Sequence, residues 1–176
     1  AAGLTQVIPG NGGIDGVCFD SANSVIVGSN PFHDPRMSSS NPLGSYYSTS
    51  NTNYWNVSKF SSAGSLQWTT STEQSPTGTW IKPGTIRTIA SDGTNIICGL
   101  INSSHGGQPG RYSLVNLSPT TGDIIWKELR VNTSPAVVDT SVVSGIIIDG
   151  AYTICYVDKA NGTYTKDVFT TATGTP

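Results

Sequence analysis

The residues that could perform chemistry in this chain are few, and they are scattered. The two histidines are His33, in PFHDP, and His105, in SSHGG, and the two glutamates are Glu73 and Glu128. His33 precedes Asp34, but adjacent side chains of an extended segment point apart and do not form a general-base pair. The motifs GxSxG, HExxH and the phosphate-binding P-loop are absent. These observations predict that the protein is not an enzyme.

The aspartates do not favour carboxylate chemistry either. Glycosidase catalysis requires two carboxyl groups about 5–10 Å apart across a cleft, whereas the aspartates here mostly occupy turns, where they cap the local backbone. Three turns offer several oxygens of the kind that Ca²⁺ binds: Asp20–Asn23, Asp92–Asn95 and Asp158–Gly162. None has the acidic density of a dedicated calcium loop. We therefore predict no metal and no cofactor, with calcium left open as an alternative.

Aromatic residues in and beside a long polar segment are the candidate binding residues. This segment, residues 29–53, is too long for a plain connection and is typical of a functional loop. Exposed aromatic faces beside amides and hydroxyls can stack on sugar rings, and the same composition suits protein contacts. The alternative is that Trp55 starts a strand, with Trp68 and Trp126 as core anchors. The candidate binding residues are Phe32, Tyr46, Tyr47, Tyr54 and Trp55, with Trp80 in a separate connection.

The three cysteines have no spacing that predicts a metal or redox site. Cys18, Cys98 and Cys155 form no CxxC motif, and each lies among strand-like apolar neighbours. We expect buried free thiols that act as small hydrophobic side chains. One disulfide with a spare thiol is the alternative in an oxidising compartment.

The composition predicts which partners and which location are expected for this protein. The 176 residues predict one domain, and charged residues make up 11% of the chain, against about 25% in an ordinary soluble domain. The nine Lys and Arg residues occur without a basic cluster, so nucleic acid is not an expected partner. No apolar run approaches the roughly 18 residues of a membrane helix, which predicts no membrane insertion. A surface rich in Ser, Thr, Asn and Gly favours an extracellular or virion-surface protein, and the start at Ala1 favours a processed or cut chain.

The elements that must position these residues are short strands. Residues 112–126, YSLVNLSPTTGDIIW, predict a hairpin whose turn is set by Pro119 and Gly122. Similar turn glycines occur at Gly64 and Gly162, which lie 58 residues before and 40 residues after Gly122. Blocks of four short strands at such a period predict propeller blades or another all-β array, and no stretch has a helical period.

The predicted organisation is a single all-β domain over residues 1–176. Its repeats cover approximately residues 14–68, 85–126 and 134–169, with the loop insertion at 29–53 and a tail at 170–176. The strands expected at exposed sheet edges are Leu4–Ile8 and Thr163–Phe169. A β-sandwich or jelly roll is the alternative, because it uses the same short strands and Gly-rich turns.

The hairpin ends resemble quinoprotein-like (PQQ-type) β-propeller repeats, whose blades end in a polar turn followed by TG-x-x-x-W. The matching segments are Ala63–Trp68, Thr121–Trp126 and Val157–Gly162, although the third has Lys166 where the family has tryptophan. The resemblance implies three degenerate blades, whereas a closed propeller has four to eight. The chain is then a fragment, closes by oligomerising, or uses similar strands in a sandwich. No residues map onto the cofactor pocket of the quinoprotein enzymes.

Three functions are compatible with these patterns. The favoured hypothesis is a non-enzymatic structural or assembly protein, such as a subunit of a virion, tail or extracellular filament. Its partners would be further copies or neighbouring structural subunits that complete its sheet edges. The second is an adhesive module that binds glycans through the Phe32–Trp55 loop. The third is a fragment of a larger propeller enzyme whose catalytic residues lie elsewhere.

Overall fold

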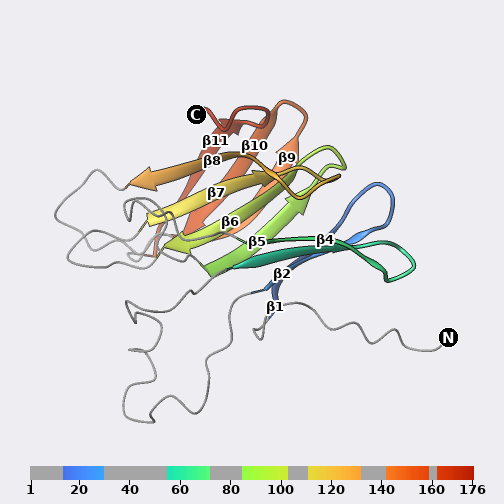
Figure 1. Ribbon diagram of the computed structural model, residues 1–176. Helices are drawn as coiled ribbons and strands as arrows, with labels where there is room; N and C mark the ends of the chain where they lie inside the picture. Colours follow the sequence, from blue (N-terminus) through green and yellow to red (C-terminus); the bar gives the residue numbers. More distant parts are fainter. Residues whose placement is uncertain (1–13, 30–54, 72–84, 103–110, 132–141, 159–161) are drawn as a thin grey trace, which may run out of the picture.

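The protein consists of antiparallel β-sheets, as the sequence predicts. The computed structural model describes residues 14–29, 55–71, 85–102, 111–131, 142–158 and 162–176, and these ranges contain eleven strands and no helix (Figure 1). Sheet A contains β1 (Ile14–Phe19), β2 (Val25–Ser29), β3 (Asn56–Phe60) and β4 (Leu66–Ser71). Sheet B contains β5 (Thr85–Ser91), β6 (Ile96–Asn102), β7 (Arg111–Leu117) and β8 (Ile124–Val131). Sheet C contains β9 (Val142–Asp149), β10 (Tyr152–Asp158) and β11 (Tyr164–Thr170).

Each sheet is a meander in which strands pair in chain order. The described strands make no crossover within a sheet or between sheets, which distinguishes the arrangement from a jelly roll. The sheets begin close to the predicted repeats at residues 14 and 85, and the third begins at Val142. Strand β11 lies at an edge of sheet C, as expected for Thr163–Phe169, whereas Leu4–Ile8 lies outside the described residues. Within the described ranges, no helix is long and apolar enough to cross a membrane.

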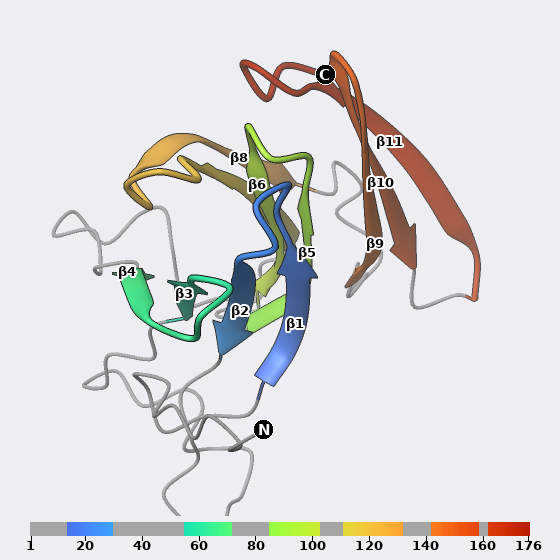
Figure 2. The same ribbon diagram turned by 90° about the vertical axis from the view of Figure 1, so that its right-hand side faces the viewer.

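The three sheets pack face to face, with sheet B between the other two (Figure 2). Their first strands are neighbours, because β1 contacts β5 and β5 contacts β9. Glycine permits this close approach. A Cβ atom at Gly28 of β2 would lie 2.5 Å from Cδ1 of Ile89, and one at Gly99 of β6 would lie 2.9 Å from Cγ1 of Val143. At either position a Cβ atom would force side chains of the next sheet to move, so both sheet pairs approach each other closely where the second strand has glycine.

Two hydrophobic clusters fill the spaces between the sheets. The first, between sheets A and B, contains Ile26, Trp55, Val57, Ile86, Ile89, Ile96, Cys98, Leu100, Val115 and Leu117. The second, between sheets B and C, contains Tyr112, Leu114, Val143, Cys155, Val157 and Phe169. Sheet B thus contributes apolar side chains to both of its faces, which explains the nearly continuous apolar runs IIC in β6 and LVNL in β7.

The first strand of each sheet carries a β-bulge at the same place. The pairing skips one residue after Ile14 in β1, after Ile86 in β5 and after Val143 in β9. These three residues are therefore equivalent, and so are the residues three positions later: Val17, Ile89 and Ile146. This structural alignment is the basis for comparing the two ends of the stack below.

Candidate functional site

The predicted aromatic binding residues are not assembled in the described part of the chain. Trp55 is fully buried in the cluster between sheets A and B, because it lies directly before β3 and its ring packs with Val57. It therefore presents no face for a sugar ring, and its place directly before β3 agrees with the alternative that it starts a strand. The other candidates, together with His33 and His105, lie outside the described residues, so a binding loop stays a prediction: Phe32, Tyr46, Tyr47, Tyr54 and Trp80.

Two of the oxygen-rich turns use their carboxylates to cap the local backbone. Oδ1 of Asp92 accepts hydrogen bonds from the amides of Thr94 and Asn95 at 2.8 and 2.7 Å. These bonds outweigh the effect of partial burial, which raises the pKa of Asp92, and hold it below its ordinary value. Oδ1 of Asp20 accepts from the amides of Ala22 and Ser24 in the same way. No group of three His, Cys, Asp or Glu residues suited to a metal occurs among the described residues, and calcium stays an untested alternative.

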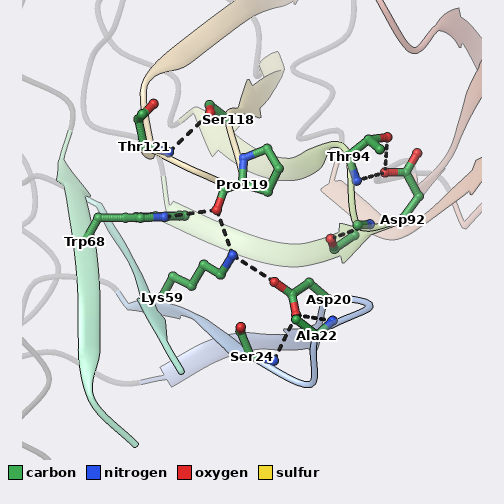
Figure 3. Close-up of polar contacts among 12 residues, drawn as sticks. Asp20, Ala22, Ser24, Lys59, Trp68, Asp92, Thr94, Ser118, Pro119 and Thr121 are labelled. Carbon is green, nitrogen blue, oxygen red and sulfur yellow. Dashed lines mark hydrogen bonds and ion pairs between the residues drawn. The ribbon is translucent and has the colours of Figure 1, made fainter. Parts of the chain in front are cut away.

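Asp20 also takes part in a polar bridge between sheets A and B (Figure 3). Nζ of Lys59 lies 2.8 Å from Oδ2 of Asp20 and donates to the carbonyl oxygen of Pro119 at 2.7 Å. Both charged side chains are almost inaccessible to solvent. Burial raises the pKa of Asp20, but the hydrogen bonds from Lys59 and from the turn amides outweigh it and hold the pKa below 3.8. The pair therefore joins sheet A to the turn between β7 and β8 of sheet B.

Two tryptophans connect consecutive sheets in the same manner. Nε1 of Trp68 in β4 donates to the Pro119 carbonyl at 3.2 Å, and Nε1 of Trp126 in β8 donates to the Thr171 carbonyl at 2.8 Å. A glycine three residues after each acceptor lies against the indole ring. A Cβ atom at Gly122 or Gly174 would be 2.7 or 2.6 Å from a ring carbon. Each tryptophan therefore fits a turn of the next sheet that only glycine can complete.

This contact shows that Gly174, and not Gly162, is equivalent to Gly122. The amide of Gly174 bonds to Thr170 as that of Gly122 bonds to Ser118, and both turns are closed by an amide-to-carbonyl bond five residues apart. Gly162 instead lies between β10 and β11, the second and third strands of sheet C. Lys166 of β11 is thus not in the tryptophan position. Residues 170–176, expected to form a tail, complete β11 and form the turn that receives Trp126.

The cysteines are free thiols, in agreement with the expectation from their neighbours. Cys98 and Cys155 are buried and Cys18 is partly buried. Burial raises the pKa of Cys18 to about 12, with a further contribution from Asp20, and that of Cys155 to about 12, with a further contribution from Asp167. Burial also raises the pKa of Cys98. None of the three thiols is activated as a nucleophile.

The outward side of β1 exposes apolar residues whose equivalents are buried. In sheet B, Ile86 and Ile89 pack against the glycines of sheet A and are 0% and 8% exposed. In sheet C, Val143 packs against Gly99 of sheet B and is 0% exposed, and Ile146 is partly buried against the cluster that contains Val143. The equivalent residues of β1, Ile14 and Val17, are 54% and 50% exposed. Sheet A therefore presents the side chains that elsewhere insert into a preceding sheet.

The opposite end of the stack also has an apolar surface. One face of sheet C packs on sheet B through Cys155, Val157 and Phe169. The strand pairing places six residues together on the other face, which we call the sheet C face: Ile147, Tyr152, Ile154, Tyr156, Tyr164 and Val168. Four of them are among the exposed large hydrophobic residues of the protein: Ile147, Tyr152, Tyr164 and Val168.

Sequence reasoning did not identify either end surface as a site, although a signal is present. A strand with one solvent face alternates apolar and polar residues, whereas β10, YTICYVD, is apolar or aromatic on both faces. Such a pattern predicts a strand covered on both sides. Comparison with known proteins gives no further indication, because no protein-family model matches the chain and no curated protein matches it significantly.

Proposed function

We propose that this protein is a non-enzymatic structural module that assembles with neighbouring subunits through the outer faces of its end sheets. The observation that carries the proposal is the exposure of Ile14 and Val17, since the equivalent Ile86, Ile89 and Val143 are buried between sheets. Large apolar side chains gain about 1.5–3 kcal/mol each on full burial. Contiguous exposed apolar surface is a common mark of a protein interface.

The repeated contacts between sheets support an assembly made by stacking. Sheets A and B, and then B and C, are joined by glycine approaches, by a tryptophan–turn contact and by a hydrophobic cluster. The tryptophan–turn contacts also support the proposed relationship to quinoprotein-like propeller repeats. A module that already joins three sheets in series needs only compatible end faces to extend the series in trans. The composition favours a location on a virion, tail or extracellular filament.

The experiment is native mass spectrometry combined with light scattering over a wide concentration range. We expect discrete multiples of the 18.4 kDa chain, or association with a structural partner from the source. Val17→Lys places a charge on the exposed side of β1 and should weaken association if that face is used. Ser62→Lys, in an exposed turn of the same sheet, is the matched control. A protein that stays monomeric alone and captures no structural partner would contradict the proposal.

A further inference from the structure

Strand β11 has an open side where its counterparts in the other sheets are paired. It is the third strand of sheet C, as β3 is of sheet A and β7 is of sheet B. β3 pairs on its far side with β4, and β7 pairs on that side with β8. No strand of the described ranges pairs with the corresponding side of β11, which lies at the edge of its sheet (Figure 2). Sheet C therefore has the three strands on which the other sheets place a fourth.

The turn after β11 has the hydrogen bond that precedes the fourth strand in sheet B. There the amide of Ser118 donates to the carbonyl oxygen of Asp123 at 2.8 Å, directly before β8 begins at Ile124. The amide of Thr170 donates to the carbonyl oxygen of Thr175 at 2.7 Å in the same way. The backbone after β11 thus turns toward the open side, as it does after β7.

The open side of β11 presents backbone donors and acceptors. Thr170 bonds toward this side, whereas the amide of the next residue, Thr171, donates at 2.8 Å to Ala151, which directly precedes β10. Backbone groups of successive residues point to alternate sides of a strand. The residues of β11 whose amide and carbonyl groups face the open side are therefore Tyr164, Lys166 and Val168. Such a row is a template for a further strand.

The β7–β8 register shows which positions of an added strand would meet the charges of β11. Asp167 is equivalent to Val115 of β7, because each pairs with the cysteine of its second strand. Lys127 of β8 lies opposite Val115, and Glu128 lies opposite the residue equivalent to Lys166. A strand with the charges of β8 would thus place a base opposite Asp167 and an acid opposite Lys166, and opposite-charge pairs across strands are stabilising.

The other sheets also indicate an aromatic residue in the added strand. Their fourth strands carry Trp68 and Trp126, and each tryptophan lies opposite the position that Val168 occupies in β11. Val168 is among the exposed large hydrophobic residues of the protein. A large apolar side chain opposite Val168 would cover part of that surface.

The charges of β11 do not suit a second copy of the same strand. Pairing two copies about a two-fold axis at the centre of the strand sets Asp167 opposite Asp167, and like charges directly opposite are destabilising. Lys166 has the exposed Asp158 of β10 on its own face, so an acid opposite it is the weaker requirement. The base opposite Asp167 therefore defines the partner most closely.

We propose that the open side of β11 binds an extended segment of a partner polypeptide as a fourth, antiparallel strand of sheet C. The segment carries a large apolar residue opposite Val168, a base opposite Asp167 and an acid opposite Lys166. This mode of recognition takes affinity from backbone hydrogen bonds and specificity from alternate side chains. The inference deepens the proposed function and rests on it, because it names the kind of partner segment that joins sheet C.

The first test measures binding of a labelled peptide to the full chain by fluorescence anisotropy. The peptide has the sequence of residues 123–131, DIIWKELRV, which includes β8. Exchange of Lys127 and Glu128 in the peptide keeps its composition and should weaken binding about 10-fold. N-methylation of the Glu128 amide should weaken binding more than about 10-fold, because that amide faces the neighbouring strand in the β7–β8 register. N-methylation of the Lys127 amide, which faces away, is the matched control.

The second test locates the peptide on β11. Lys166→Pro removes an amide donor from the open side and leaves the side that pairs with β10 unaltered, so it should abolish binding. Lys166→Ala keeps the donor and should reduce binding only modestly. The comparison of the two N-methylated peptides uses the unaltered chain, so it decides the question if Lys166→Pro fails to fold by circular dichroism.

The outcomes separate the inference from the proposed function. Weaker binding after N-methylation of Glu128 than of Lys127, with loss of binding in Lys166→Pro, supports the inference. No binding of the unmodified peptide, equal binding of the two N-methylated peptides, or full binding to a folded Lys166→Pro chain overturns it. A chain that assembles in native mass spectrometry but does not bind the peptide overturns the inference alone. A chain that binds the peptide as expected, yet stays monomeric and captures no structural partner, overturns the proposed function and leaves β11 as a strand-binding edge.

Discussion

Trp126 and Thr171 connect sheets B and C through one hydrogen bond, and the Trp126 ring also packs against the turn that contains Thr171. The indole Nε1 donates to the Thr171 carbonyl at 2.8 Å, and the ring lies against Gly174 of the same turn. Trp68 repeats the arrangement with Pro119 and Gly122 between sheets A and B. Because the contact joins the end of one sheet to the next, its strength should determine whether the stack unfolds as a unit.

The first prediction concerns the indole donor. Trp126→Phe keeps an aromatic ring but removes the hydrogen bond, and it should lower the free energy of unfolding by about 1 kcal/mol. Trp126→Ala also removes the packing and should lower it by about 3 kcal/mol. Urea unfolding followed by circular dichroism measures both values. Lys127→Ala, at the exposed position of β8 that follows Trp126, is the control. Equal stabilities for all three variants would show that the contact does not join the sheets.

The second prediction concerns the glycines between sheets. Gly28→Ala and Gly99→Ala place a methyl group 2.5 and 2.9 Å from atoms of the next sheet, and each should lower the free energy of unfolding by about 1–3 kcal/mol. Gly145→Ala is a matched control, because its Cβ would meet its nearest atom at 4.0 Å. This control should change stability by less than about 0.5 kcal/mol. Thermal or urea unfolding measures these changes in stability. An equal effect at all three positions would contradict close packing between the sheets.

The sequence allowed the fold class to be predicted, because strand signals are local. Alternating residues and turn glycines identified strands near 112–117 and 124–126, and the structure places β7 and β8 there. The equivalence of repeats was harder, since it depends on strand order and not on glycine spacing alone. Gly162 and Gly174 both lie in sequence segments that contain turn-forming residues. Only the contact with Trp126 shows that Gly174 completes the repeat.

The candidate site was predicted less well because exposure depends on tertiary packing. Trp55 adjoins a polar segment, so its sequence context favours an exposed position, yet its ring lies in the core. Ile14 and Val17 differ from expectation in the opposite direction. Their apolar character predicts burial, but the residues that would cover them are not among the described sheets, and they are exposed. Local sequence contains no information on which face of an apolar strand lacks a neighbour.

The third prediction concerns the buried pair of Lys59 and Asp20. Because the folded-state pKa of Asp20 lies below its ordinary value of 3.8, the carboxylate stabilises the fold above that value, and this stability is lost as pH falls through the folded pKa. Asp20→Asn leaves Lys59 buried without its counter-ion and should cost about 3 kcal/mol at neutral pH. Asp92→Asn changes a carboxylate that accepts hydrogen bonds from the neighbouring turn residues Thr94 and Asn95, and it should cost less. The free energy of unfolding is measured across the acidic pH range for the wild type and both variants. If its dependence on pH were the same in Asp20→Asn as in the wild type, the role of the pair would be contradicted.

The fourth prediction concerns the thiols. A pKa of about 12 for Cys18, against an ordinary 9.0, lowers its thiolate fraction at mildly alkaline pH by about 1000-fold. Cys98 and Cys155 are buried as well, so all three should react with a thiol reagent much more slowly in the folded protein than in denaturant. Cys18, the least buried of the three, should react first. Mass spectrometry of timed labelling gives the order, with the chain in guanidinium as the control for reagent activity. Rapid labelling of Cys98 without unfolding would show that sheets A and B separate readily, because that thiol lies in the cluster between them.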